Sequence, residues 1–103
     1  MNHMVKHIIL WKLKDELTKE EKEQVKAGIK EGLESLAGQI PGLLDIKVRT
    51  ECLESSNVDV MLDTTFEDEA SLKGYSVHPM QVAVADGEVR PYTAVRSCMD
   101  YEV

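Results

Sequence analysis

The chain has 103 residues, of which 43% are hydrophobic and 30% are charged, and its formal net charge is −7. This composition is typical of a folded globular chain, and the length suits one domain of about 100–150 residues. Nineteen acidic against twelve basic side chains disfavour binding to the phosphates of nucleic acid or to an anionic membrane surface. We therefore expect a single domain over residues 1–103 that binds neither nucleic acid nor a membrane.

Targeting signals and cysteine motifs are missing from the sequence. Apolar runs fall short of the ~20 residues that a membrane helix needs, and the first residues lack the apolar region and cleavage site of a secretory signal. Cys52 and Cys98 form neither a C-x-x-C pair nor a disulfide framework. Reduced thiols and a cytoplasmic location are the expectation.

Residues 5–13 alternate in the manner of a β-strand. Ile8 and Leu10 share one face with lysines, so apolar residues occur on both faces, which predicts a central strand that is covered on both sides. The residues of the other face are Val5, His7, Ile9, Trp11 and Leu13.

An amphipathic helix is predicted to begin at Thr18. Glu21, three residues later, completes a T-x-x-E capping box. Apolar residues then recur at helical spacing as far as Ile40, and Gly38 and Pro41-Gly42 are expected to end the helix.

Two glycines lie four residues apart within this predicted helix, at Gly28 and Gly32. Each costs roughly 1 kcal/mol relative to alanine in a helix interior. The charged residues around them exclude a membrane dimerisation motif. We expect that they let the helix approach the sheet or a partner closely.

Two further strands are predicted over residues 43–52 and 58–66, joined by a turn at 55–57. In the first of them Leu44, Ile46 and Val48 alternate with charged residues and are expected to share a face.

The last third of the chain predicts a broken helix and a final strand. The acidic residues 67–69 suit the first turn of a helix, and Pro79 is expected to restart the helix at its first position. Residues 87–91 are predicted to be a loop and residues 92–103 a strand. The order β-α-β-β-α-β indicates an α+β fold of the ferredoxin-like, split βαβ type with a four-stranded antiparallel sheet.

Several segments together resemble the stress-responsive α/β-barrel domain family, the Dabb proteins, in order and at the family's spacing. The resemblance implies a ferredoxin-like protomer whose sheet pairs with that of a second copy to close a dimeric α+β barrel. The segments that carry it are Val5 to Lys14, Ile40-Pro41-Gly42, Thr65-Phe66-Glu67, Tyr75 with His78-Pro79, and Met99-Asp100-Tyr101.

The apolar pattern of the first strand also predicts a homodimer. Helices cover one face of such a sheet, which leaves Ile8 and Leu10 on the opposite face, where a second copy would bury them. Met99, Tyr101 and Val103 on the last strand are candidates for the same patch, although the sequence does not fix their register.

The resemblance also implies which residues would be catalytic. Many members have no defined biochemical activity, but a plant cyclase of the family closes a polyketide chain by aldol condensation, using a tyrosine and the second histidine of an H-P-x-H motif. Tyr75 matches the tyrosine and His78 the first histidine, whereas Gln81 occupies the position of the second. A glutamine amide does not accept a proton at neutral pH, so the expected base is missing.

The candidate pocket residues are His7, Trp11, Tyr75, His78 and Gln81. Three of them also have a structural interpretation: His7 as a core histidine, His78 as part of a break between two helices, and Tyr75 as a residue at the edge of the core. Zinc spacings, phosphate loops and dinucleotide motifs do not occur, so we expect neither metal nor cofactor.

The sequence supports two hypotheses about function. The first is a stress-responsive homodimer of undefined biochemical activity, without a firm catalytic residue, that holds a small apolar ligand in each protomer. The alternative is a cofactor-free enzyme, polyketide cyclase-like or monooxygenase-like, that acts on an aromatic or acyl ligand through His7 and Tyr75.

Overall fold

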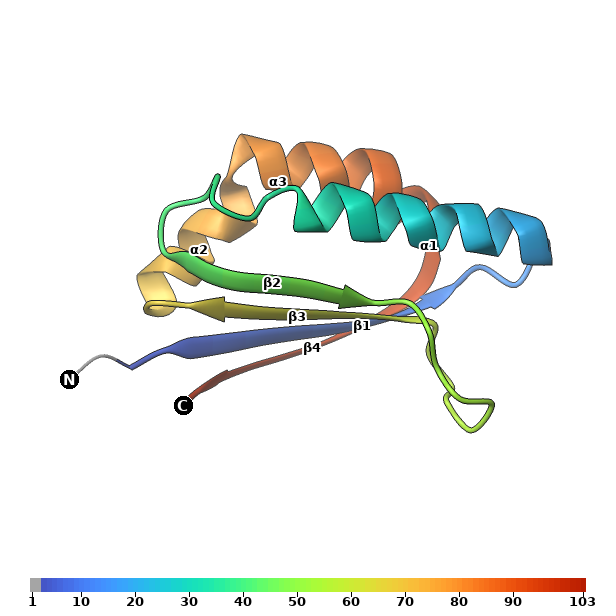
Figure 1. The fold of residues 1–103 in the computed structure, drawn as a ribbon, viewed down its shortest axis with the longest axis horizontal. Coiled ribbons are helices and arrows are strands. Elements are labelled where there is room, and N and C mark those ends of the chain that lie inside the picture. The colour runs from blue at the N-terminus through green and yellow to red at the C-terminus, as the bar shows by residue number, and fades with distance from the viewer. Residues whose placement is uncertain (1–2) are drawn as a thin grey trace.

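The computed structural model describes residues 3–103 as a four-stranded antiparallel sheet with helices over one face (Figure 1). The strands lie in the order β2-β3-β1-β4. Their bounds are β1 Val5–Leu13, β2 Leu43–Arg49, β3 Val60–Phe66 and β4 Thr93–Glu102; the helices are α1 Lys19–Glu34, α2 Glu69–Val77 and α3 Pro79–Val84. The predicted ferredoxin-like order is confirmed. Within residues 3–103 no helix has both the length and the apolar character needed to cross a membrane.

β1 occupies the centre of the sheet, between β3 and β4, as its two apolar faces predict. Its helix-facing side chains Val5, Ile9, Trp11 and Leu13 are all buried. His7 is buried in the same row, and the hydroxyl of Thr64 on β3 donates a hydrogen bond of 2.7 Å to the His7 carbonyl. β1 therefore supplies a row of buried side chains against which the helices pack.

α1 begins as predicted, with Thr18 as its N-cap. The Thr18 hydroxyl accepts a hydrogen bond from the Glu21 amide (3.1 Å), and the Glu21 carboxylate accepts one from the Thr18 amide (2.8 Å). The prediction that the helix continues toward Ile40 is wrong, because α1 ends at Glu34. Beyond it the amides of residues 36, 37 and 39 bond to carbonyls three residues earlier, so tight turns replace the helix while Leu36 and Ile40 stay buried.

The two glycines of α1 permit a close approach, but to another part of the chain than predicted. A Cβ atom on Gly28 would lie 2.6 Å from Glu88 Oε2, and one on Gly32 would lie 2.9 Å from Val84 Cγ1. Within the chain the neighbour is thus the helical segment after α2 and not the sheet. Figure 1 shows α1 and α3 side by side above the sheet.

β2 and β3 are shorter than predicted, since β2 ends at Arg49 and β3 begins at Val60. The pairing of β2 with β3 shifts register between Leu43 and Asp45. The shift places Leu44 apart from the buried Ile46 and Val48, and its side chain is 52% exposed. The prediction that Leu44 shares a face with Ile46 and Val48 is therefore wrong, because the alternation does not reveal the register shift.

The break between α2 and α3 at Pro79 is confirmed, but the loop predicted over 87–91 is wrong. Residues Ala85–Val89 continue as a turn of π-helix and Arg90–Tyr92 as a 3₁₀ turn. An ion pair between Asp86 and Arg90 spans this segment, and Ala85 and Val89 are buried. Burial of its apolar positions and this i,i+4 pair outweigh the turn tendency of Gly87 and Pro91.

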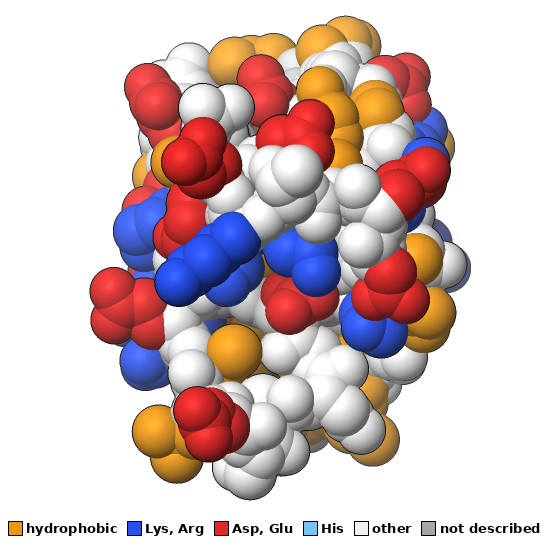
Figure 2. Space-filling view, turned by 90° about the vertical axis from the view of Figure 1, so that its right-hand side faces the viewer, with side chains coloured by type: hydrophobic (Ala, Val, Ile, Leu, Met, Phe, Trp, Pro, Cys, Tyr) orange, Lys and Arg blue, Asp and Glu red, His pale blue; other side chains and the backbone are white. Residues whose placement is uncertain are grey.

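No helix of residues 3–103 covers the other face of the sheet, and only the β2–β3 loop extends below it, at the end where it borders Leu10 (Figure 1). The register pairs Ile8 with Met99 and Lys6 with Tyr101, so the candidate residues of β4 lie on this face beside those of β1. Its exposed apolar side chains include Val95, Met99 and Tyr101. By contrast, the end of the molecule where α1 begins shows acidic and basic side chains interspersed (Figure 2).

Candidate functional site

A cavity of about 330 Å³ lies between the helix-facing side of β1 and the segment that follows α2. It brings together four of the five predicted pocket residues, namely His7, Trp11, Tyr75 and Gln81. Its other lining residues are Ile9, Leu33, Leu62, Ala85, Val89, Arg90, Thr93 and Arg96.

His78 belongs to the helix break instead of the cavity lining. Its Nδ1 atom accepts a hydrogen bond of 3.2 Å from the Met80 amide, and its extended backbone separates α2 from α3. The residue thus has the structural role that the sequence offered as the alternative to chemistry.

Tyr75 contributes a buried hydroxyl to the cavity. The residue is 2% exposed, and among the described residues its hydroxyl has no hydrogen-bond partner. Burial raises the pKa of Tyr75 to about 12, against the opposing effects of the Gln81 amide and the Arg96 charge. The Tyr75 ring contacts Phe66 and His7 edge-on, with centroid separations of 5.1 and 6.0 Å, and this packing holds it in place. At neutral pH the hydroxyl keeps its proton and can donate a hydrogen bond.

His7 pairs with an acid on the neighbouring strand. Its Nδ1 atom lies 2.5 Å from Asp100 Oδ1, and the two residues are directly opposite in the β1–β4 register. Because a carboxylate only accepts, Nδ1 donates this hydrogen bond, which leaves Nε2 as the ring nitrogen available to another partner. The arrangement is that of a histidine oriented by a carboxylate, as in catalytic triads.

Cys98 completes this group of side chains. Its thiol lies 3.4 Å from Asp100 Oδ1 and 3.8 Å from His7 Nδ1. Partial burial, the hydrogen bond to Asp100 and the Asp100 charge raise the pKa of the Cys98 thiol, and Arg96 opposes them. The cysteine is therefore a poor nucleophile where it stands.

Sequence reasoning missed Asp100, Cys98 and Arg96 as members of the site. They alternate along β4 and share its helix-facing side with His7. The only signal was this period-2 polar pattern on the last strand. The pattern could not be used without the register, because the opposite face of β4 is just as exposed.

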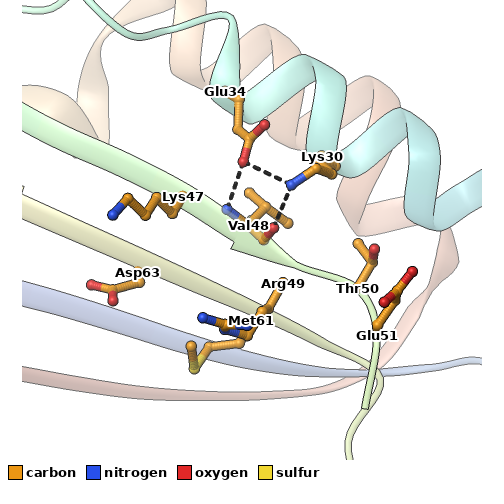
Figure 3. A pocket seen from close by; sticks show the side chains of 9 residues that line it. All are labelled: Lys30, Glu34, Lys47, Val48, Arg49, Thr50, Glu51, Met61 and Asp63. Atoms are coloured by element: carbon orange, nitrogen blue, oxygen red, sulfur yellow. Dashed lines mark hydrogen bonds and ion pairs between the residues drawn. The ribbon is translucent and has the colours of Figure 1, made fainter.

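A second hollow, of about 370 Å³, lies between α1 and the edge of β2 (Figure 3). Within it Lys30 and Glu34 bind the carbonyl and the amide of Val48, at 2.9 and 3.0 Å. Partial burial raises the pKa of Glu34, but the Val48 amide and Lys30 outweigh it, so this pKa lies below its usual value. The two side chains therefore pair with each other and with the backbone groups at the edge of β2. We interpret this hollow as part of the packing of α1 against the sheet edge.

Solved structures share this fold over almost the whole chain. A dimeric protein of unknown function from Bacteroides fragilis is 33% identical, with 97% of this chain and 96% of that chain covered and a TM-score of 0.91. A Dabb family protein from Mesorhizobium loti is 20% identical (96% and 95% covered, TM-score 0.73). A hydroxynitrile lyase from Passiflora edulis is 18% identical (100% and 95% covered, TM-score 0.74), a likeness that concerns the fold alone. No curated protein matches the sequence.

The family comparison covers the same extent. The model of the stress responsive A/B barrel domain matches residues 5–103, from the first residue of β1 to the end of the chain. This span contains every element of the sheet and every residue that lines the cavity. The chain belongs to the stress responsive A/B barrel domain (Dabb) family.

Proposed function

We propose that the protein is a homodimer that binds a small, largely apolar molecule carrying a carbonyl or carboxylate oxygen, in the cavity above His7. The observation that carries this proposal is the buried Tyr75 hydroxyl without a partner among the described residues. A buried donor left unpaired costs about 1–3 kcal/mol. A ligand oxygen that accepts from Tyr75 would remove that cost.

The rest of the cavity suits such a ligand. Aliphatic and aromatic side chains form much of the wall, among them Ile9, Trp11 and Leu62. The volume of about 330 Å³ falls at the small end of the about 300–1,000 Å³ usual for ligand sites. Arg96 adds a positive charge to the same wall, which favours a carboxylate over a neutral carbonyl.

Matched pairs of ligands test the proposal. Small aromatic and acyl carboxylates are compared with hydrocarbons of the same shape in calorimetric titrations. We expect the carboxylates to bind, and Tyr75→Phe to weaken their binding about tenfold, equal to about 1.4 kcal/mol. Tyr101→Phe removes an identical hydroxyl from the opposite face of the sheet and should leave binding unchanged. Equal binding of both ligand classes, or no loss in Tyr75→Phe, would reject the proposal.

The uncovered sheet face supports the homodimer. Ile8 and Leu10 lie at its centre, and the exposed Met99 and Tyr101 flank Ile8 and Lys6. The similar protein from Bacteroides fragilis is described as dimeric. Two such faces related by a twofold axis would cover one another and close a barrel.

Light scattering behind size exclusion tests the dimer. Wild-type protein at micromolar concentration should have the mass of two chains. Leu10→Glu should give a folded monomer, because a dimer would bury its charge unpaired. Val77→Glu introduces the same charge at a valine that is 75% exposed at the end of α2, away from that sheet face, and this variant should remain dimeric. A wild-type mass of one chain would contradict the assembly.

The His7–Asp100 contact of 2.5 Å favours one further candidate, a cofactor-free acid–base enzyme. Asp100 would hold the imidazole so that Nε2 removes a proton from carbon next to a carbonyl, and Tyr75 would donate to the enolate oxygen. Turnover of a linear polyketide thioester, lost in Asp100→Asn, would favour this candidate over binding alone.

The family's name associates these domains with stress responses, and our proposal extends that role to this protein. A cytoplasmic location is part of the same proposal. The exposed, unbridged Cys52 and Cys98 suit a reducing compartment.

A further inference from the structure

We propose that His7, Cys98 and Asp100 form a binding site for a divalent transition-metal ion, of which Zn²⁺ is the best match. The ligand atoms of these three side chains lie within 4.8 Å of one another. No sequence motif indicates this group, since His7 and Cys98 are 91 positions apart and zinc sites are recognised by short spacings. Only the antiparallel pairing of β1 with β4 brings them together.

The distances suit a tetrahedral ion. With bonds of about 2.0–2.3 Å, two ligands of tetrahedral zinc lie about 3.5 Å apart. Cys98 Sγ is 3.8 Å from His7 Nδ1 and 3.4 Å from Asp100 Oδ1. The third separation, 2.5 Å between His7 Nδ1 and Asp100 Oδ1, must widen. The Asp100 side chain is 46% exposed and can make that movement, whereas the buried His7 stays fixed.

Binding requires two changes of proton position. The Nδ1 proton that His7 donates to Asp100 must leave, and the neutral ring then carries its proton on Nε2. The Cys98 thiol releases its proton to solvent and coordinates as thiolate. The thiolate and the carboxylate together balance the charge of a divalent ion. A thiolate, an imidazole and one carboxylate select zinc-like ions over Mg²⁺, which prefers oxygen ligands alone.

The geometry also leaves room for chemistry at the metal. Three protein ligands leave the fourth tetrahedral position to water or substrate, as in catalytic rather than structural zinc sites. His7 belongs both to this group and to the wall of the cavity. An ion held here would therefore lie beside the ligand proposed above, although its binding does not depend on that ligand.

Metal titrations of the reduced, tag-free protein test the site. We expect one equivalent of Zn²⁺ per chain, and we expect Co²⁺ to give a sulfur-to-cobalt charge-transfer band that Zn²⁺ abolishes and Mg²⁺ does not. Cys98→Ser should remove the band and weaken Zn²⁺ binding by more than about tenfold, since losing even the supporting partner of a ligand costs about 10–100-fold. Asp100→Asn should also weaken Zn²⁺ binding.

Two control variants distinguish this site from metal binding at the second thiol and from ligand binding in the cavity. Cys52→Ser changes the other thiol, which is exposed in the β2–β3 loop, and should leave the band and the affinity unchanged. Tyr75→Phe, which should weaken carboxylate binding in the cavity, should leave Zn²⁺ binding intact. Weak or multiple binding in the wild type, or a band that survives Cys98→Ser, would overturn the site. Circular dichroism of each variant confirms that it folds.

Discussion

Replacing Tyr75 by phenylalanine should stabilise the ligand-free protein, whereas the loss of a buried tyrosine hydroxyl usually destabilises. The residue is 2% exposed, and its hydroxyl has no partner among the described residues. The substitution removes an unpaired polar group and leaves the ring in contact with Phe66 and His7. The penalty for burying an unpaired hydroxyl is about 1–3 kcal/mol. Part of this is lost again to the small void that the oxygen leaves, so we expect a net gain of about 1 kcal/mol.

Chemical denaturation at one fixed protein concentration measures this effect, because the stability of a dimer depends on concentration. For a domain of this size a gain of about 1 kcal/mol also raises Tm by about 4–8 °C. Tyr92→Phe serves as the matched control and should change stability little, since Tyr92 is only half-buried and lies in the turn before β4, away from the uncovered sheet face. A loss of about 1 kcal/mol or more in Tyr75→Phe would refute the reasoning. It would mean that the hydroxyl has a partner in solution, for which Gln81, whose side chain lowers the pKa of Tyr75, is a candidate.

Three further predictions concern the fold. Thr18→Ala removes the acceptor of the capping box and should cost about 0.5–2 kcal/mol in denaturation; an unchanged stability would mean that α1 starts elsewhere. Gly32→Ala should destabilise by about 1 kcal/mol, because the added Cβ would lie 2.9 Å from Val84 Cγ1. In the control Gly74→Ala the added Cβ has no atom of residues 3–103 within 4 Å, and this helix substitution should stabilise by a similar amount. The pKa of Glu34 is lowered from 4.5, so its contribution is complete above pH 4.5 and is lost as the pH falls through the lower folded value. The stability difference between wild type and Glu34→Gln should therefore shrink in acid, and a constant difference would contradict the role of this carboxylate.

Much of the fold could be predicted because the relevant signals are local. The two apolar faces of residues 5–13 define a central strand, and the pair Thr18 and Glu21 marks the start of α1. Burial of Ala85 and Val89 overrode the turn signals of Gly87 and Pro91, which no local pattern could reveal.

The candidate site was predictable only in part. His7 and Tyr75 follow from strand parity and from the family resemblance, and both line the cavity. Asp100 and Cys98 reach His7 only through the register of β4, an edge strand of which both faces are largely exposed and whose polar pattern specifies no register.

A crystal structure of the protein with the tightest-binding carboxylate tests the central claim most directly. We predict that the ligand lies in the cavity between β1 and the segment after α2, with one oxygen within hydrogen-bond distance of the Tyr75 hydroxyl. A ligand located elsewhere, for example in the charged hollow beside Lys30 and Glu34, would contradict the account. So would a ligand in the cavity that leaves the Tyr75 hydroxyl unpaired.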